Sequence, residues 1–349
     1  MELRELRELR ELKVVDLEFG YHYQRGSRCQ SGSRCQRDPR ESGLLISGIG
    51  LRVSAGEILV IIGPNGAGKT TLLKCLNKKL SPTGGVVYLD GQDIANLKQK
   101  DIARKVGVIP QISHVSFPFR VIDVVRMGRY PHQGFWKELN QEDHRIVDQA
   151  MKITGAETLR ERLITELSGG EYQRMIFARA LAQDPKVLLM DEPTLHLDLS
   201  HQLGLLDLIR DLVREKGLIA VIILHDLNMA FRYSDQILLL NQGRIYRYGP
   251  SEEVITKENI RQVYQVEVEI YESHADSGNG NGVRPCITPV RVSRLEDQQE
   301  NQGENQEETQ RDVKRDIKEK NQRERQREKM LSLSGDLPAG QSQKYGERA

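Results

Sequence analysis

Gly63-Pro64-Asn65-Gly66-Ala67-Gly68-Lys69-Thr70 is the stretch that decides the fold of this chain, because it matches the phosphate-loop pattern G-x-x-x-x-G-K-[ST]. The apolar run Ile58–Ile62 precedes it, and the run Thr71–Leu76, typical of a helix, follows it. Glycines let successive backbone N–H groups turn towards a phosphate, and the start of the helix adds a favourable dipole. The loop therefore predicts the binding of ATP or GTP.

Two side chains of the loop have distinct expected roles. Lys69 would reach the β- and γ-phosphates, and the Thr70 hydroxyl would bind Mg²⁺. The other residues of the predicted phosphate-binding set are Gly63, Pro64, Asn65, Gly66, Ala67, Gly68 and Thr71. A glycine-rich turn that ends in Lys-Thr by chance is the alternative, expected in roughly one such chain in a hundred.

A pair of acids after a second apolar run predicts the rest of the nucleotide site. Val187–Met190 reads as a buried strand and leads into Asp191 and Glu192, at the edge where parallel sheets place ligands. Asp191 is expected to hold Mg²⁺ through water, and Glu192 to orient or deprotonate the attacking water. A strand that runs into an acidic helix cap is the alternative, and Pro193 is compatible with it.

Composition bounds the class of protein. The chain has 349 residues and a net charge of +1, so no global field recruits nucleic acid or a membrane surface. No apolar run approaches the roughly 20 residues that cross a bilayer, and no apolar signal core is apparent. Cys29 and Cys35 lie in a near-duplication with only His22 nearby, which favours a solvated insert over a metal or redox site. We expect a cytosolic protein.

Three segments appear added to a globular core at 14–292. Residues 1–13 repeat Glu-Leu-Arg, about 24–42 form a polar insert, and 293–349 form a Gln/Glu/Arg/Lys-rich tail, predicted to be disordered. The predicted strands are Val14–Tyr23, Leu51–Val53, Ile58–Ile62, Val86–Leu89, Val106–Ile109, Val187–Met190, Ile219–Leu224 and Gln236–Leu240. The predicted helices are Asp143–Thr154, Gly170–Ala182 and Gln202–Glu215. Their alternation predicts an α/β fold with a parallel sheet, and the early strands predict an additional antiparallel piece.

The string Leu167-Ser168-Gly169-Gly170-Glu171 turns these motifs into a family resemblance. Alone it is a helix start, with Ser168 as the cap and Glu171 at the third position. Between the phosphate loop and the acidic strand it resembles the signature of ATP-binding cassettes. From about Val14 to Val292 the chain resembles the nucleotide-binding subunit of an ABC transporter. This resemblance implies a RecA-like P-loop NTPase core, an antiparallel β subdomain and an inserted helical subdomain at about 111–175.

The resemblance implies roles for further residues. Gln111 would touch Mg²⁺ or the lytic water and relay the nucleotide state to a membrane partner, and His225 would contact the γ-phosphate. Asp198 would organise a dimer interface. Ser168 and Gly170 would meet the ATP held by the opposite subunit, so two subunits would close head to tail around two ATP molecules.

Two positions depart from the pattern of the family. An aromatic residue near the first strand would stack on adenine, and Tyr21 is the candidate, but the following insert lengthens its distance to the phosphate loop. Tyr21, Tyr23 or neither stacks there, and a core tyrosine is the alternative. In Leu195-His196-Leu197-Asp198, His196 replaces a small residue, as a neutral variation or as a change in how two sites communicate.

The segment Met127-Gly128-Arg129-Tyr130-Pro131-His132 refines the resemblance to importers of iron-siderophores, haem and cobalamin, by analogy alone. It implies a homodimer of ATPase subunits, a dimeric integral-membrane permease and, indirectly, a periplasmic or extracellular substrate-binding protein. The expected place is the cytoplasmic face of the membrane, with ATP and Mg²⁺ as cofactors and no nucleic acid. The alternative function is a cytosolic ABC ATPase acting on nucleic acid or ribosomes.

Overall fold

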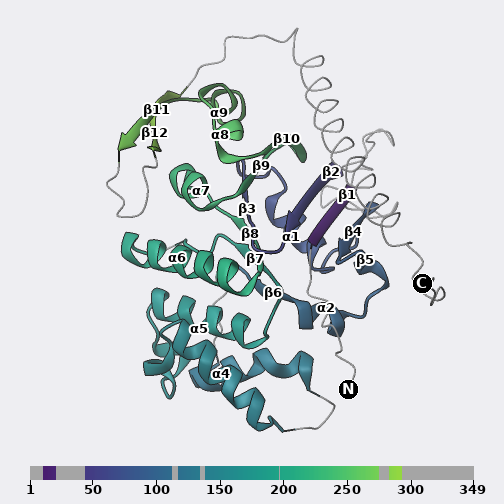
Figure 1. Cartoon of the computed structure of the whole chain (residues 1–349), viewed down its shortest axis with the longest axis vertical. Coiled ribbons are helices and arrows are strands. Elements are labelled where there is room, and N and C mark those ends of the chain that lie inside the picture. The colour runs from purple at the N-terminus through teal and green to yellow at the C-terminus, as the bar shows by residue number, and fades with distance from the viewer. Residues whose placement is uncertain are drawn as a thin grey trace, which may run out of the picture. The chain divides into compact units, whose positions relative to one another are not determined.

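Two larger sheets, a short hairpin and a set of helices make up the described part of the computed structural model (Figure 1). The structure describes residues 11–20, 44–111, 117–133, 138–195, 197–274 and 283–292. All of them belong to one compact unit, Met1–Gln302, and a second unit, Gly303–Ala349, contains none of them. The predicted extension, insert and tail therefore lie wholly or largely outside the described residues.

The central sheet has six strands in the order β10-β9-β3-β8-β7-β6. Five are parallel, and only β10 runs antiparallel, beside β9. Their bounds are β3 Ile58–Ile62, β6 Val106–Ile109, β7 Val187–Asp191, β8 Ile219–Ile223, β9 Gln236–Asn241 and β10 Arg244–Gly249. Every residue of β3, β7 and β8 is buried, which explains their unbroken apolar sequences.

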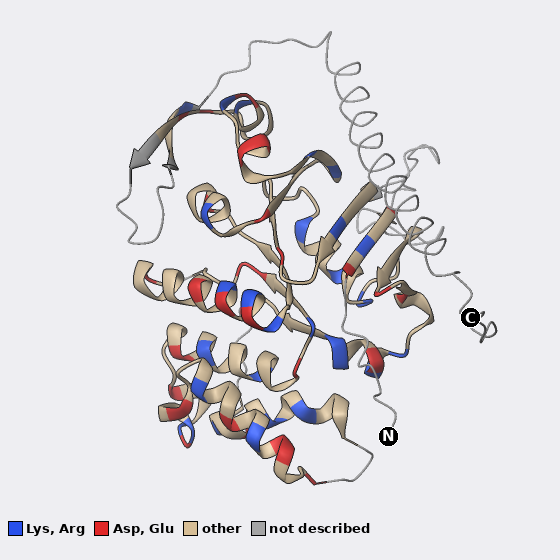
Figure 2. Cartoon of the chain, in the orientation of Figure 1, with Lys and Arg blue, Asp and Glu red and all other residues tan. Residues whose placement is uncertain are grey.

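Helices cover both faces of this sheet (Figure 1). Ile58, Val60 and Ile62 of β3 join the large core cluster, together with residues from α5, α6 and α7. Leu59 and Ile61 point to the opposite face, because successive side chains of a strand alternate. The helices around the sheet are α1 Lys69–Leu76, α2 Gln99–Lys105, α5 Gly169–Ala182, α6 Leu199–Lys216 and α7 Leu227–Tyr233. Acidic and basic residues alternate along α6, which is amphipathic (Figure 2).

An antiparallel sheet with the order β2-β1-β4-β5 accompanies the core. Its strands are β1 Glu11–Gly20, β2 Leu44–Ser54, β4 Gly84–Leu89 and β5 Gln92–Asp93. A bulge interrupts β1 at Asp16, whose φ is +46°. Gly85 lies against this bulge, where a Cβ atom would come within 2.3 Å of the Asp16 carbonyl oxygen, so only glycine fits. The predicted antiparallel piece is confirmed.

The inserted helical part lies between β6 and β7. It contains α3 Val121–Arg126, a 3₁₀ helix at Met127–His132, α4 Gln141–Ile153 and α5. Two short 3₁₀ turns in this part lie at Glu157–Leu159 and Ile164–Glu166, and another, at Ile94–Asn96, precedes β6. A capping box at Asn140 starts α4, and the predicted capping box of Ser168 and Glu171 starts α5.

After β10 the chain adds elements that the sequence reasoning did not predict. They are α8 Ser251–Val254, α9 Lys257–Tyr264 and the antiparallel hairpin of β11 Val266–His274 and β12 Val283–Val292. Val268 and Ile287 of the hairpin are buried in the large core cluster. The hairpin is therefore packed on the core.

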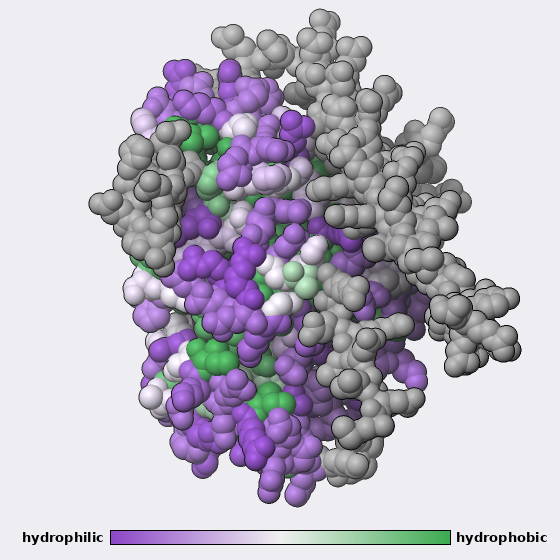
Figure 3. All heavy atoms as spheres, in the orientation of Figure 1, coloured by the Kyte–Doolittle hydropathy of each residue, from purple (hydrophilic) through white to green (hydrophobic). Residues whose placement is uncertain are grey.

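Several element boundaries differ from the prediction. The first strand runs from Glu11 to Gly20, so the predicted end at Tyr23 lies outside the described residues. The predicted strand Leu51–Val53 is the end of the longer β2, because Gly48 and Gly50 hide the strand pattern of its first half. Within the described ranges, no helix is both long and apolar enough to span a bilayer. The visible face is mostly hydrophilic, with small hydrophobic patches (Figure 3).

Candidate active site

The phosphate loop connects the end of β3 to α1, as its sequence predicts. Gly63 has φ +147°, and a Cβ atom there would come within 2.2 Å of the Leu240 carbonyl oxygen, so glycine is required. The Lys69 ammonium lies inside the loop and donates to the carbonyl oxygens of Gly63 (2.7 Å) and Pro64 (2.9 Å). Burial lowers the pKa of Lys69, while the charges of Glu192 and Asp191 act in the opposite direction.

Thr70 and Asp191 bring two side-chain oxygen groups together beside the loop. The Thr70 hydroxyl donates to Asp191 Oδ1 at 3.3 Å, and Asp191 is 9% exposed at the end of β7. Burial raises the pKa of Asp191, and the hydrogen bond from Thr70 opposes that shift. A hydroxyl and a carboxylate next to a phosphate loop suit Mg²⁺, which takes few protein ligands and keeps several waters.

Glu192 lies where the ends of three neighbouring strands meet. Its Oε2 accepts from Gln111 Nε2 at 3.0 Å, and its Oε1 lies 2.5 Å from His225 Nε2. Gln111 follows β6, Glu192 follows β7 and His225 follows β8, which are adjacent in the sheet. The carboxyl edge of the parallel sheet thus collects an amide, a carboxylate and an imidazole in one place.

The backbone holds Glu192 in an unusual conformation. Its φ is +52°, in the left-handed region that costs a residue with a Cβ atom free energy. The next residue, Pro193, offers its carbonyl oxygen to the buried amide of Gln173 at 2.9 Å. Gln173 lies in the first turns of α5, so this bond joins the signature helix to the residue after Glu192. No motif in the sequence predicts this role of Gln173.

The signature residues form the exposed start of α5. Ser168 caps the helix, and its hydroxyl donates to Glu171 Oε2 at 2.9 Å. A Cβ atom on Gly169 would meet nothing within 4 Å, and one on Gly170 would meet only Leu197 and His201, at ordinary van der Waals distances. The packing of this chain therefore does not explain why both positions are glycine. Among the described residues, no hydrogen bond joins Ser168 or Gly170 to the site around Glu192.

Asp198 caps α6. Its Oδ1 accepts from the backbone N–H of His201 at 2.9 Å and lies 2.8 Å from His201 Nδ1. The backbone hydrogen bond from His201 is the main cause of a lowered pKa of Asp198. The expected role of Asp198 in a dimer interface stays a prediction. Tyr21, Tyr23 and His196 lie outside the described residues.

The end of α9 and the residue that follows it, Val263–Gln265, lie near the phosphate loop. A pocket of about 390 Å³ lies between them, lined by Pro64, Asn65, Gly66, Ala67, Asn241, Gln242, Val263, Tyr264 and Gln265. Burial raises the pKa of the Tyr264 hydroxyl, and the neighbouring backbone of Gly63 opposes that shift. Tyr264 therefore lies beside the loop, a contact that no motif in the sequence indicates.

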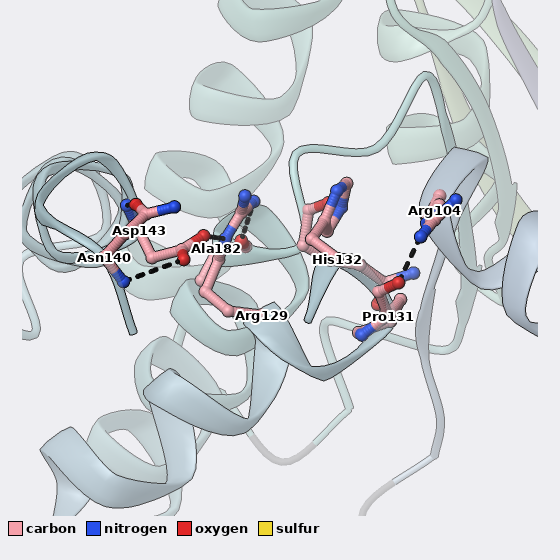
Figure 4. A network of polar contacts seen from close by, with 8 residues as sticks. Arg104, Arg129, Pro131, His132, Asn140, Asp143 and Ala182 are labelled. Atoms are coloured by element: carbon pink, nitrogen blue, oxygen red, sulfur yellow. Dashed lines mark hydrogen bonds and ion pairs between the residues drawn. The ribbon is translucent and has the colours of Figure 1, made fainter. Parts of the chain in front are cut away.

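The Gly-Arg-Tyr-Pro-His segment ties the helical part to the core (Figure 4). Arg129 is 6% exposed, pairs with Asp143 of α4 at 2.8 Å and donates to the Ala182 carbonyl oxygen at 2.9 Å. His132 Nε2 lies 2.8 Å from the Gln183 carbonyl oxygen, and burial lowers the pKa of His132. This segment therefore fixes the path of the chain between the helical part and β7.

Three aromatic side chains on the helical part face solvent. Phe117, Phe119 and Tyr130 are 68%, 43% and 61% exposed. The ring centroids of Phe117 and Phe119 lie 6.2 Å apart. Exposed aromatic residues of this size mark contact surfaces more often than isolated apolar residues do.

The phosphate loop, the neighbouring oxygen groups of Thr70 and Asp191, and the Glu192 carboxylate at the edge of the sheet are arranged as in P-loop proteins that bind and hydrolyse a nucleoside triphosphate.

A family model described as ABC transporter matches residues 46–195. The petrobactin import ATP-binding protein FpuC of Bacillus anthracis is 38% identical over 244 residues, 70% of this chain and 87% of that protein. The iron(3+)-hydroxamate import ATP-binding protein FhuC of Bacillus subtilis is 39% identical over 227 residues, 65% of this chain and 84% of that protein.

A comparison with solved structures agrees with the sequence comparison. A chain from an inward-facing conformation of a proposed metal-chelate type ABC transporter has a TM-score of 0.66 at 26% identity. The match covers 80% of this chain and 98% of that one. The present chain therefore belongs to the ATP-binding proteins of ABC transporters, and it is an ATP hydrolase.

Proposed function

We propose that this chain powers an importer of an iron(III)-siderophore or a related metal chelate, such as haem or cobalamin. The contact of Glu192 with both Gln111 and His225 carries the catalytic part of this proposal. The named cargoes of the relatives, petrobactin and iron(3+)-hydroxamate, support the choice of substrate class. None of the residues described above would touch the cargo, which passes through other subunits.

The residues around the phosphate loop divide the work of hydrolysis. Lys69 would exchange its bonds to the loop carbonyls for contacts with the β- and γ-phosphates. Thr70 and Asp191 would hold Mg²⁺, with Gln111 beside them, and the bound ion supplies positive charge to the phosphates. Glu192 would accept the proton of the attacking water, and His225 would orient Glu192 and contact the γ-phosphate.

A second copy of the chain would complete each site. Ser168 and Gly169 are exposed, and the start of α5 presents free backbone N–H groups and a positive dipole end. These groups suit the γ-phosphate of an ATP held by a partner, which would also explain the two glycines that local packing leaves unexplained. The proposed assembly is a head-to-tail homodimer around two ATP molecules.

The proposed partner in the membrane is a dimeric permease, at whose cytoplasmic face this chain would bind. The exposed rings of Phe117, Phe119 and Tyr130 are the proposed contact surface on the helical part. Phe117 follows Gln111 closely in the chain, so a contact there would be connected to the residue that touches Glu192. Cargo would reach the permease from a separate substrate-binding protein.

The catalytic proposal is tested with Glu192→Gln. This variant should bind ATP with wild-type affinity, while its turnover should fall at least about 100-fold, because the amide cannot accept a proton. Phosphate release and binding of a fluorescent ATP analogue measure the two effects. Glu161→Gln changes an exposed glutamate that pairs with Arg120 at 2.8 Å and serves as the control. Near-normal hydrolysis by Glu192→Gln would remove Glu192 from the role of base.

The transport proposal is tested in the native host. Cells that lack the chain should lose uptake of a ⁵⁵Fe-labelled siderophore, and the wild type but not Glu192→Gln should restore it. A pull-down from detergent-solubilised membranes should recover a multi-helix permease. Recovery of nucleic acid or ribosomes instead, with uptake unchanged, would support the alternative of a cytosolic ABC ATPase.

A further inference from the structure

The C-terminal hairpin is attached to the helix that follows His225. Asn228, in the first turn of α7, donates from Nδ2 to the Ile287 carbonyl oxygen at 3.1 Å. The backbone N–H of Ile287 donates in return to Asn228 Oδ1 at 2.7 Å. The side-chain amide thus pairs with β12 as the backbone of a neighbouring strand would.

Apolar packing holds the same two elements together. Ile287 and Val268 of the hairpin are 4% and 5% exposed, and they belong to the core cluster that also contains Ala230 and Tyr233 of α7. Apolar contacts are non-directional, so they hold the hairpin on the helix without fixing their relative rotation. The two hydrogen bonds of Asn228 are directional, and they set that rotation.

The start of α7 is connected to the catalytic residues. Asp226 caps the helix and accepts from the Met229 N–H at 3.0 Å, so the first turn is a rigid unit. His225 immediately precedes this cap, and its Nε2 lies 2.5 Å from Glu192 Oε1. A rotation of α7 would therefore displace His225 relative to Glu192.

We infer that Asn228 is a positioning residue for ATP hydrolysis, through which the hairpin of β11 and β12 holds His225 against Glu192. Among the described residues no hydrogen bond joins Asn228 to the phosphate loop or to Glu192, so Asn228 acts through His225. The inference rests on the role proposed above for His225. A purely structural role, in which Asn228 only fastens the hairpin, makes a different prediction about activity.

Asn228→Ala separates the two roles. It removes both hydrogen bonds, and because Asn228 is itself exposed, the truncation leaves no buried cavity. The turnover number should fall about 10-fold, since a misplacement of about 1 Å costs up to about 100-fold. The KM for ATP should stay unchanged, because the phosphate loop is not altered. Steady-state phosphate release by the full chain measures both quantities.

The same change is then made in the His225→Ala background, with hydrolysis followed at excess enzyme over radiolabelled ATP. If Asn228 acts through His225, the Asn228→Ala change should have no further effect there, because effects of residues that act as a unit are not additive. An equal loss in both backgrounds, or wild-type turnover in the single variant, would overturn the inference. If Asn228→Ala does not fold, Asn228→Asp takes its place, because it places a carboxylate against the Ile287 carbonyl oxygen.

Asn259→Ala is the matched control. Asn259 lies in α9 and donates from its side-chain amide to the carbonyl oxygen of Val254 at 2.9 Å, a hydrogen bond that includes no residue of α7. Its loss should lower the unfolding temperature but not the turnover number. Wild-type turnover in His225→Ala alone would refute the proposed role of His225. An impaired His225→Ala beside a fully active Asn228→Ala would refute only the present inference.

Discussion

Asp143→Ala should destabilise the chain far more than the loss of an ordinary surface ion pair. The side chains of Arg129 and Asp143 are 7% and 9% exposed, and they join the 3₁₀ helix at Met127–His132 to α4. Burial would raise the pKa of Asp143, but the hydrogen bonds from Arg129 and the Asn140 backbone outweigh it and lower the pKa. The carboxylate is therefore ionised at neutral pH and balances the buried guanidinium.

The magnitude follows from what the substitution leaves behind. Arg129 keeps its bond to the Ala182 carbonyl oxygen but loses its counter-charge, and an uncompensated buried charge costs about 3–5 kcal/mol. The capping box that Asp143 shares with Asn140 is lost as well, which is worth about 1 kcal/mol. We expect the free energy of unfolding to fall by about 4–6 kcal/mol in total, a large share of the stability of a domain.

Urea denaturation followed by circular dichroism at 222 nm measures this loss. Asp148→Ala is the control, because Asp148 pairs with Arg160 at 2.7 Å but is 55% exposed, and such pairs contribute about 1 kcal/mol or less. The double variant Arg129→Met/Asp143→Ala should recover much of the loss, since it removes the stranded charge. A loss in Asp143→Ala no larger than in Asp148→Ala would refute the reasoning.

Two further predictions concern pH and glycine. Burial holds the pKa of His132 below its unfolded value near 6.5. The neutral imidazole therefore contributes its full share of the folding stability above that pH, and this share is lost as the pH falls. His132→Asn should reduce the difference between the urea midpoints measured at pH 7.5 and pH 5.5. Gly63→Ala should abolish ATP binding, because its Cβ atom would meet the Leu240 carbonyl oxygen. Gly170→Ala should match or exceed the wild-type unfolding temperature, because its Cβ atom has room in this chain and alanine favours a helix. The same variant should still lose ATPase activity. Thermal unfolding and phosphate release test both glycines, and a fully active Gly170→Ala would contradict the proposed dimer site.

The central sheet was predictable because burial on both faces leaves a plain signal. β3 and β6 have the predicted bounds, and β7 and β8 differ from them by one residue. The convergence of Gln111, Glu192 and His225 on one point depends on strand order, which no periodicity specifies. The expected role of Glu192 came from its place after an apolar strand, and those of Gln111 and His225 came from the family resemblance; all three roles stay predictions.

The C-terminal contacts were not predictable by the same means. Pro285 and Pro289 lie in β12, and proline normally argues against a strand; β12 tolerates both because, among the described strands, it pairs with β11 alone. The hydrogen bonds between Asn228 and Ile287, and the contact of Tyr264 with the phosphate loop, join residues far apart in the chain without any charge or motif. Such contacts follow from tertiary packing, which local sequence does not encode.

The position of β3 has a consequence for the synthesis of the chain. β3 lies between β8 and β9, so its two hydrogen-bonding neighbours are translated about 160 and about 180 residues after it, roughly 10–35 s later at ribosomal rates of about 5–20 residues per second. Throughout that interval the nascent chain carries a wholly apolar strand with two open edges. The phosphate loop at its end gains a fixed frame only after residues 219–241 have left the ribosome. ATP binding thus cannot assist the early folding of this chain, and both edges of β3 stay open to incorrect strand pairing until then.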